Sequence, residues 1–186
     1  MFSHKRHLGK LASATAIAAS SILSVAAVQA ETTSTPMVLT AYINGAGGES
    51  VLAGKYDAAL KEIDSYRSMS SLTYSAKLTN LCVTYAAKKQ LTEAKVACDS
   101  AVSAAKQDRI GSLRYLSGSA IENSYVAIAY TNRAVVHMMA KDAESAKNDL
   151  ARAKSLAPSA EFVSKNLTAM QNTSSKIAQL NVAPSR

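Results

Sequence analysis

The chain has 186 residues, with 21 Lys and Arg against 13 Asp and Glu, so its formal net charge at pH 7 is +8. The basic residues are spread along the chain without interleaved aromatic residues, so we expect no nucleic-acid binding. After residue 30 the chain contains one histidine, His137, and its two cysteines are not spaced as a CxxC pair. This composition excludes a zinc site of the Cys2His2 kind or a histidine cluster, and we expect neither metal nor cofactor.

Residues 1–30 are expected to form a cleaved signal peptide. Three basic residues within the first ten precede an uncharged stretch from Leu11 to Ala30, and small residues occupy positions 28 and 30, as at signal peptidase sites. Serine and threonine dilute the stretch, so a membrane span is the weaker interpretation. Cleavage would leave all 13 acidic residues and remove three of the 21 basic ones, giving a net charge of +5. We therefore expect a periplasmic or secreted protein with no stable membrane anchor.

Residues 31–47 are predicted to be a flexible N-terminal segment. Its end is rich in glycine, and the stretch NGAGGES at 44–50 superficially resembles a loop that cradles phosphate. It lacks the Lys-Ser/Thr ending of such loops, and no strand convincingly precedes it, so we interpret it as a connecting loop. From there on, apolar residues recur at helical spacing with almost no alternation, which predicts an all-α protein.

An internal repeat organises the helical part of the chain. Residues 79–102 align with residues 131–154 at an offset of 52, and residues 54–66 align with the first of these segments at an offset of 35. The alignment pairs small and bulky positions of a second helix, matching Ala94, Cys98 and Ala101 with Ala146, Leu150 and Ala153. Small residues at such spacing let two antiparallel helices approach closely while bulky residues interleave.

The segment from Asp142 to Pro158, with Ala146, Leu150 and Ala153, resembles the second helix of a tetratricopeptide repeat. This resemblance implies a short right-handed α-solenoid of helix–turn–helix units, covering residues 48–172 in all. The expected parts are units at about 48–68, 73–106 and 125–158, an insertion at about 107–124, a capping helix at 159–172 and a tail at 173–186. The first unit departs most from the family pattern, because glycines weaken its first helix.

In this family, an asparagine on the first helix of a unit often binds the backbone of an extended peptide in the concave groove. The resemblance therefore implies that Asn80 and Asn132 face such a groove, although a solvated helix face remains an open interpretation. The expected lining is small and apolar, and it consists of Val83, Ala87, Val135 and Met139 beside the two asparagines. It carries no central row of basic residues, so it differs from family members that grip acidic C-termini.

Cys82 and Cys98 are expected to form a disulfide. Export would place them where disulfides persist, and each lies eight residues from a turn centred near Gln90. At about 1.5 Å of rise per residue, both would lie level on facing helices. Two buried free thiols are the alternative.

The function we favour is a non-enzymatic protein–protein interaction module of the cell envelope, binding a peptide segment or protein partner on the concave helix face. One alternative is a structural subunit that self-associates into a homo-oligomer. A hydrolytic enzyme with the insertion as a lid is the least favoured, because no nucleophile-elbow pattern accompanies His137, which aligns with Tyr85 on a core face.

Overall fold

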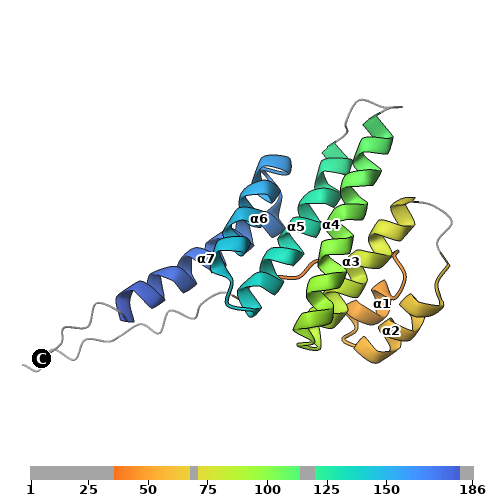
Figure 1. Ribbon diagram of the computed structural model, residues 1–186, viewed down its shortest axis with the longest axis horizontal. Coiled ribbons are helices and arrows are strands. Elements are labelled where there is room, and N and C mark those ends of the chain that lie inside the picture. The colour runs from red at the N-terminus through yellow and green to blue at the C-terminus, as the bar shows by residue number, and fades with distance from the viewer. Residues whose placement is uncertain (1–35, 68–70, 114–119, 181–186) are drawn as a thin grey trace, which may run out of the picture. The chain divides into compact units, whose positions relative to one another are not determined.

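The computed structural model describes residues 36–67, 71–113 and 120–180, and all regular secondary structure in these ranges is α-helical. This confirms the all-α class. The predicted signal peptide, the centre of the insertion and the last six residues lie outside the described residues. The helices are α1 (Gly48–Leu52), α2 (Tyr56–Ser65), α3 (Ser71–Ala87), α4 (Leu91–Leu113), α5 (Ala120–Met139), α6 (Ala143–Leu156) and α7 (Glu161–Leu180) (Figure 1).

Three helical hairpins share one turn geometry. The turns α1–α2, α3–α4 and α5–α6 each contain one residue with positive φ, namely Gly54 (71°), Lys89 (61°) and Lys141 (63°). In each turn the next residue donates its N–H to the carbonyl five positions earlier, at 2.8, 3.0 and 2.8 Å. This is the Schellman arrangement, which satisfies the last carbonyls of a helix. The three turns are separated by the same offsets, 35 and 52, as the sequence repeat.

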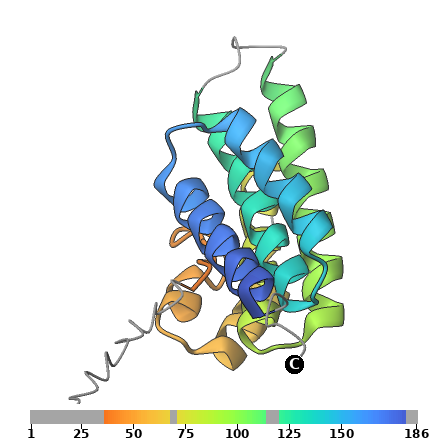
Figure 2. The same cartoon turned by 90° about the vertical axis from the view of Figure 1, so that its left-hand side faces the viewer.

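The hairpins follow one another along the chain and contact their neighbours. Helix α3 packs against α4, α4 against α5, and α5 against α6 (Figure 1), while α7 lies beside α5 and α6 (Figure 2). Ala146, Leu150 and Ala153 have no exposed surface. These small and bulky residues therefore occupy the interior positions expected from their spacing.

Two boundaries differ from the sequence prediction. Most of the expected insertion at 107–124 lengthens α4 and α5 instead of forming a separate segment, because α4 continues to Leu113 and α5 already begins at Ala120. The capping helix was expected to end at 172, but α7 continues to Leu180. No Gly or Pro interrupts residues 161–180, and Ile177 and Leu180 continue the apolar spacing, so nothing in the sequence ends the helix earlier. In the described part of the chain, none of the helices is long and apolar enough to cross a membrane.

Candidate peptide groove

Three asparagines from three different helices lie along one face of the protein. Asn80 belongs to α3, Asn132 to α5 and Asn166 to α7, and each has no exposed surface. We call these three residues the asparagine ladder. Burying an amide is costly unless its oxygen and its nitrogen are both hydrogen-bonded, so the partners of these side chains matter.

Each ladder asparagine pairs with the main chain of residues 36–42, which we call the docked segment. Asn166 accepts from Val38 N at 2.6 Å and donates to Val38 O at 2.8 Å. Asn132 makes the same pair with Thr40, at 2.8 and 2.8 Å, and Asn80 with Tyr42, at 2.7 and 2.9 Å. Among uncharged side chains only an amide offers an acceptor and two donors in this arrangement. The ladder thus forms hydrogen bonds with the main chain of every second residue of an extended segment.

The side chains between the paired residues point to the apolar side of the groove. Met37 packs against the cluster of Ala134, Ala146 and Leu150, and Leu39 and Ala41 pack near Val83. Val38, by contrast, is 39% exposed. The contrast between Met37, Val38 and Leu39 follows from the two-residue period of an extended chain. Tyr42 departs from it, because its ring packs against Tyr125.

The predicted groove residues lie on this face, and the protein's own segment packs beside them. Val83 and Val135 are buried, and Ala87 and Met139 are half-buried. The sequence predicts a flexible segment at 31–47, whereas residues 36–47 follow a path fixed by hydrogen bonds to residues 38, 92 and 128 positions away. The amino-acid composition of this segment indicates a loop. It carries no information on hydrogen-bond partners that lie so far away in the sequence.

A glycine-rich turn returns the chain from the docked segment to α1. Gly45 donates its N–H to Tyr42 O at 3.0 Å, and Asn80 adds a bond to Ala46 O at 3.1 Å. A Cβ at Gly48 would lie 2.0 Å from Tyr42 O, and Gly47 has φ of 70°. Both positions therefore require glycine. The glycine stretch that superficially resembles a phosphate loop serves here as a tight reversal of the chain.

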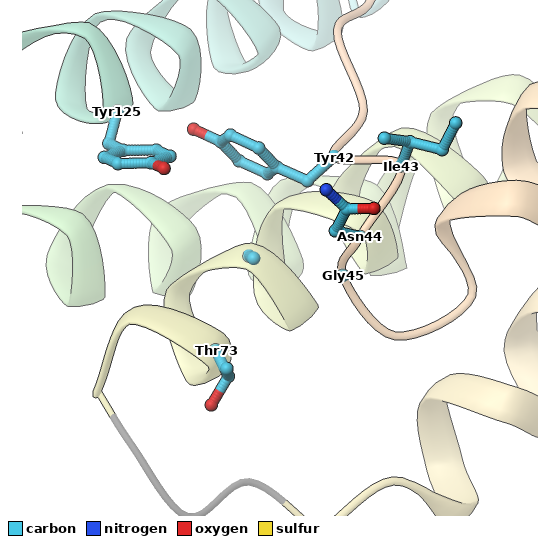
Figure 3. A pocket seen from close by; sticks show the side chains of 7 residues that line it. Tyr42, Ile43, Asn44, Gly45, Thr73 and Tyr125 are labelled. Carbon is cyan, nitrogen blue, oxygen red and sulfur yellow. The ribbon is translucent and has the colours of Figure 1, made fainter. Parts of the chain in front are cut away.

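Tyr42 closes the groove at its α3 end. Figure 3 shows its ring directed toward Tyr125 of α5, and the ring centroids are 5.2 Å apart. The Tyr42 hydroxyl is buried without a hydrogen-bond partner among the described residues. Burial raises the pKa of this hydroxyl above its ordinary value, and Tyr125 raises it further. An open pocket of about 250 Å³ adjoins the pair, lined by Tyr42, Ile43, Asn44, Gly45, Thr73, Ala76 and Tyr125.

Cys82 of α3 and Cys98 of α4 face one another, and their sulfurs lie at disulfide distance, as the sequence predicted. Their Cα atoms are 4.8 Å apart, within the range that a disulfide requires. The pair lies in the same cluster as Ala86 and Ala94. It therefore fixes α3, the helix that carries Asn80, against α4.

His137 lies in a cluster of charged residues between α5 and α6. Its ring nitrogens are 3.5 Å from Asp142 and 3.7 Å from Asp149. Arg133 donates two hydrogen bonds to Asp149, at 2.7 and 2.8 Å, and one to Asp99 of α4, at 2.9 Å. The bonds to Asp149 raise the pKa of Arg133 above its ordinary range. In the parts of the chain with described structure, no three His, Cys, Asp or Glu side chains gather as a metal site.

Sequence reasoning missed the third member of the ladder and the identity of its occupant. Asn166 follows Asn132 by 34 residues, close to the offset of 35 already present in the repeat, so extending the period into the capping helix would have found it. Comparisons of the chain with protein-family models, with curated proteins and with solved structures find no match.

Proposed function

We propose that this protein is a non-enzymatic interaction module of tetratricopeptide-like hairpins, and that its asparagine ladder holds an extended peptide by the main chain. The observation that carries the proposal is the pairing of Asn80, Asn132 and Asn166 with the N–H and C=O of alternate residues in the docked segment. Main-chain pairing of this kind does not depend on the side chains of the peptide, so the same ladder suits many sequences.

The hydrogen bonds alone do not account for stable docking. Each contributes about 1 kcal/mol net, while ordering a residue of free peptide costs about 1–2 kcal/mol. Three asparagines make six bonds to Val38, Thr40 and Tyr42, and these together contribute less than the cost of ordering the segment. The remaining free energy of docking comes from the apolar contacts of Met37 and Leu39. The ladder sets the register of the peptide, and the apolar wall sets the affinity.

The proposal places the protein in an oxidising compartment such as the periplasm or the extracellular space. The facing pair Cys82 and Cys98 supports this location, because disulfides persist there and are rare in reducing cytosol. The location and the peptide role are consistent with one another but are tested separately.

The test uses full-chain protein with Thr40→Pro and a labelled peptide of residues 36–43. Proline removes the Thr40 N–H that Asn132 accepts, so it weakens docking of the internal segment while every groove residue stays native. We expect the peptide to bind this variant more tightly than the wild-type protein, measured by fluorescence anisotropy. N-methylation at the peptide's Thr40 should weaken binding about tenfold, the effect of one lost hydrogen bond with its partner left unpaired.

Matched controls are available because, among the described residues, the amides of the segment alternate between bonded and unbonded. Within residues 36–67, 71–113 and 120–180, the N–H of Leu39 has no hydrogen-bond acceptor, so N-methylation there should have little effect. Asn80→Ala with Asn132→Ala should weaken capture, whereas Asn148→Ala on the exposed face of α6 should not. Equal affinity for peptides methylated at positions 39 and 40 would refute main-chain recognition by the ladder.

Self-association is the second candidate, and one surface favours it. Val96 is 64% exposed and borders a shallow apolar depression between α3 and α4, lined by Leu78, Leu81, Tyr85 and Ala97 among others. Sedimentation over a hundredfold range of concentration, with Val96→Lys as the comparison, tests this candidate. A mass that rises with concentration in the wild type but not in the variant would favour a homo-oligomer.

A further inference from the structure

The docked segment does not fill the groove. An open space of about 410 Å³ remains beside it, bounded by Met37 and Leu39 of the segment itself. The other lining residues come from α3, α5 and α7 and the turn after α3, and they are Ala86, Ala87, Lys89, Val135, Met138, Met139 and Thr173. A groove wall with unused apolar surface next to a bound peptide can hold a better-fitting peptide.

The lining residues define what would fit. Ala86 and Ala87 form a shallow floor on α3, while Met138 and Met139 on α5 are flexible apolar side chains that adapt to irregular shapes. The lining of this space is largely uncharged, and Lys89 is its single charged member. A large apolar side chain on an extended backbone would therefore fit this open space.

The segment is tied to the groove that it occupies. Only the turn of residues 43–47 separates Tyr42, bonded to Asn80, from Gly48 at the start of α1. Hydrogen bonds from Gly45 N–H to Tyr42 O at 3.0 Å and from Gly48 N–H to Gly45 O at 2.9 Å hold this reversal tight. A short tether of this kind gives the segment an effective concentration in the millimolar range. A separate peptide of the same sequence would therefore compete poorly.

From these observations we infer that the docked segment is an internal occupant, displaced by an extended partner peptide that carries a bulkier apolar or aromatic side chain at the position of Leu39. The partner takes the register of the segment, with its N-terminal end at Asn166 and its C-terminal end at Asn80. A small residue stands at the position of Ala41, which packs against Val51, Ala59 and Val83. The inference rests on the proposed function, and it adds the class of partner and the competition that regulates access.

The experiment uses full-chain wild-type protein and three labelled peptides of residues 36–43. One has the native sequence, one has Leu39→Trp, and the matched control has Val38→Trp, which places the indole on the exposed side. We expect the Leu39→Trp peptide to bind about tenfold more tightly than the native peptide, the gain from burying roughly 50 Å² of added apolar surface. The Val38→Trp peptide should show no such gain.

Displacement is measured in the same samples by hydrogen exchange. Binding of the Leu39→Trp peptide should accelerate exchange of the amides of Val38, Thr40 and Tyr42 in the protein, since each loses its asparagine acceptor. The variant Ala87→Phe, which fills the open space, should abolish the advantage of the tryptophan peptide. Equal affinities of the Leu39→Trp and Val38→Trp peptides, or tight binding without faster exchange at Thr40, would overturn the inference.

The two proposals fail in different ways. If the native peptide does not bind the Thr40→Pro protein, the peptide function itself is wrong. If the native peptide binds that variant but tryptophan at position 39 brings no gain, the ladder stands and only the inferred partner class is wrong. A second measurement stays within the chain: Leu39→Trp in the full protein should slow exchange at Thr40, because the larger side chain fills the open space.

Discussion

The hairpins α3–α4 and α5–α6 have the same turn and place an asparagine at the same position, yet they are held together by different means. At the centre of α3–α4, Cys82 faces Cys98 at disulfide distance. The equivalent residues of α5–α6, at an offset of 52, are Ala134 and Leu150, which form one buried cluster. A repeat thus fixes the position of its ladder asparagine, while the interior contact that supports it varies between a covalent bond and close packing.

The flanking positions differ in the same way. Arg133 and Asp149 form an ion pair in α5–α6, and their equivalents in α3–α4 are the apolar Leu81 and Ala97. The N-cap of α6 is Asp142, whose side chain accepts from Ser145 N at 3.0 Å, and its equivalent before α4 is Gln90. Four sets of substitutions, three of which exchange residues between the hairpins, test which of these differences matter.

The largest effect is expected for Leu150→Ala. Leu150 has no exposed surface, and removing its side chain would leave a cavity between α5 and α6, which costs about 4 kcal/mol. Urea denaturation measures this loss. The matched control is Leu52→Ala, a leucine that is 59% exposed, for which a change well below 1 kcal/mol is expected. Comparable losses at the two positions would contradict the interior role of Leu150.

Loss of the cysteine bond should have the next largest effect. Cys82 and Cys98 close a loop of sequence separation 16, so Cys82→Ala with Cys98→Ala should lower the free energy of unfolding by about 3 kcal/mol. The combination Cys82→Ala with Cys98→Leu copies the α5–α6 interior and should recover part of this loss. Urea curves with and without reductant provide the measurement. If the urea midpoint of the wild-type protein does not change with reductant, the bond contributes nothing to stability.

Exchange of the ion pair should have a smaller effect. Arg133→Leu leaves the Asp149 carboxylate buried without its main partner and should cost about 2 kcal/mol. Arg133→Leu with Asp149→Ala copies Leu81 and Ala97 of the other hairpin, and it should cost less than about 1 kcal/mol because no buried charge remains. Thermal unfolding of the single and double variants tests this. A double variant as unstable as the single one would show that the pair itself, and not the unpaired charge, matters.

The smallest effect concerns the helix caps. Hydrogen bonds from Ser145 lower the pKa of Asp142 below its ordinary value. A carboxyl that is more acidic in the folded state stabilises the fold above its unfolded-state pKa, near 4, and this contribution is lost as pH falls through the folded pKa. Asp142→Asn should therefore flatten the acid side of the stability profile. Gln90→Asp should add about 0.5–1 kcal/mol at pH 7, measured by urea denaturation, and no gain would show that α4 needs no cap.

The elements that repeat were predictable, and the elements that occur once were not. The equivalence of Asn80 and Asn132 followed from an alignment of the chain with itself. The facing of Cys82 and Cys98 followed from their equal distances from the turn near Gln90. The docked segment has no counterpart elsewhere in the chain. Its place depends on hydrogen bonds from Val38, Thr40 and Tyr42 to residues far along the sequence, and periodicity carries no information on such pairs.

Helix ends were predictable only where a helix-breaking residue such as proline follows them. Pro158 correctly limits α6, which ends at Leu156. The end of α7 has no breaker before Pro184, so the expected boundary at 172 was placed too early. The insertion was recognised as extra length, but length alone does not distinguish a separate loop from two longer helices.

The docked segment also bears on how the protein folds. Contacts within and between neighbouring hairpins are local in sequence, and proteins built from such contacts can unfold one unit at a time. The segment instead joins positions 128, 92 and 38 residues apart. Closing such long loops is slow, so we expect docking to follow hairpin formation and to couple the hairpins α3–α4 and α5–α6 and helix α7 into one cooperative transition. Release of the segment by a partner would then loosen the ends of the array from each other while each hairpin stays folded.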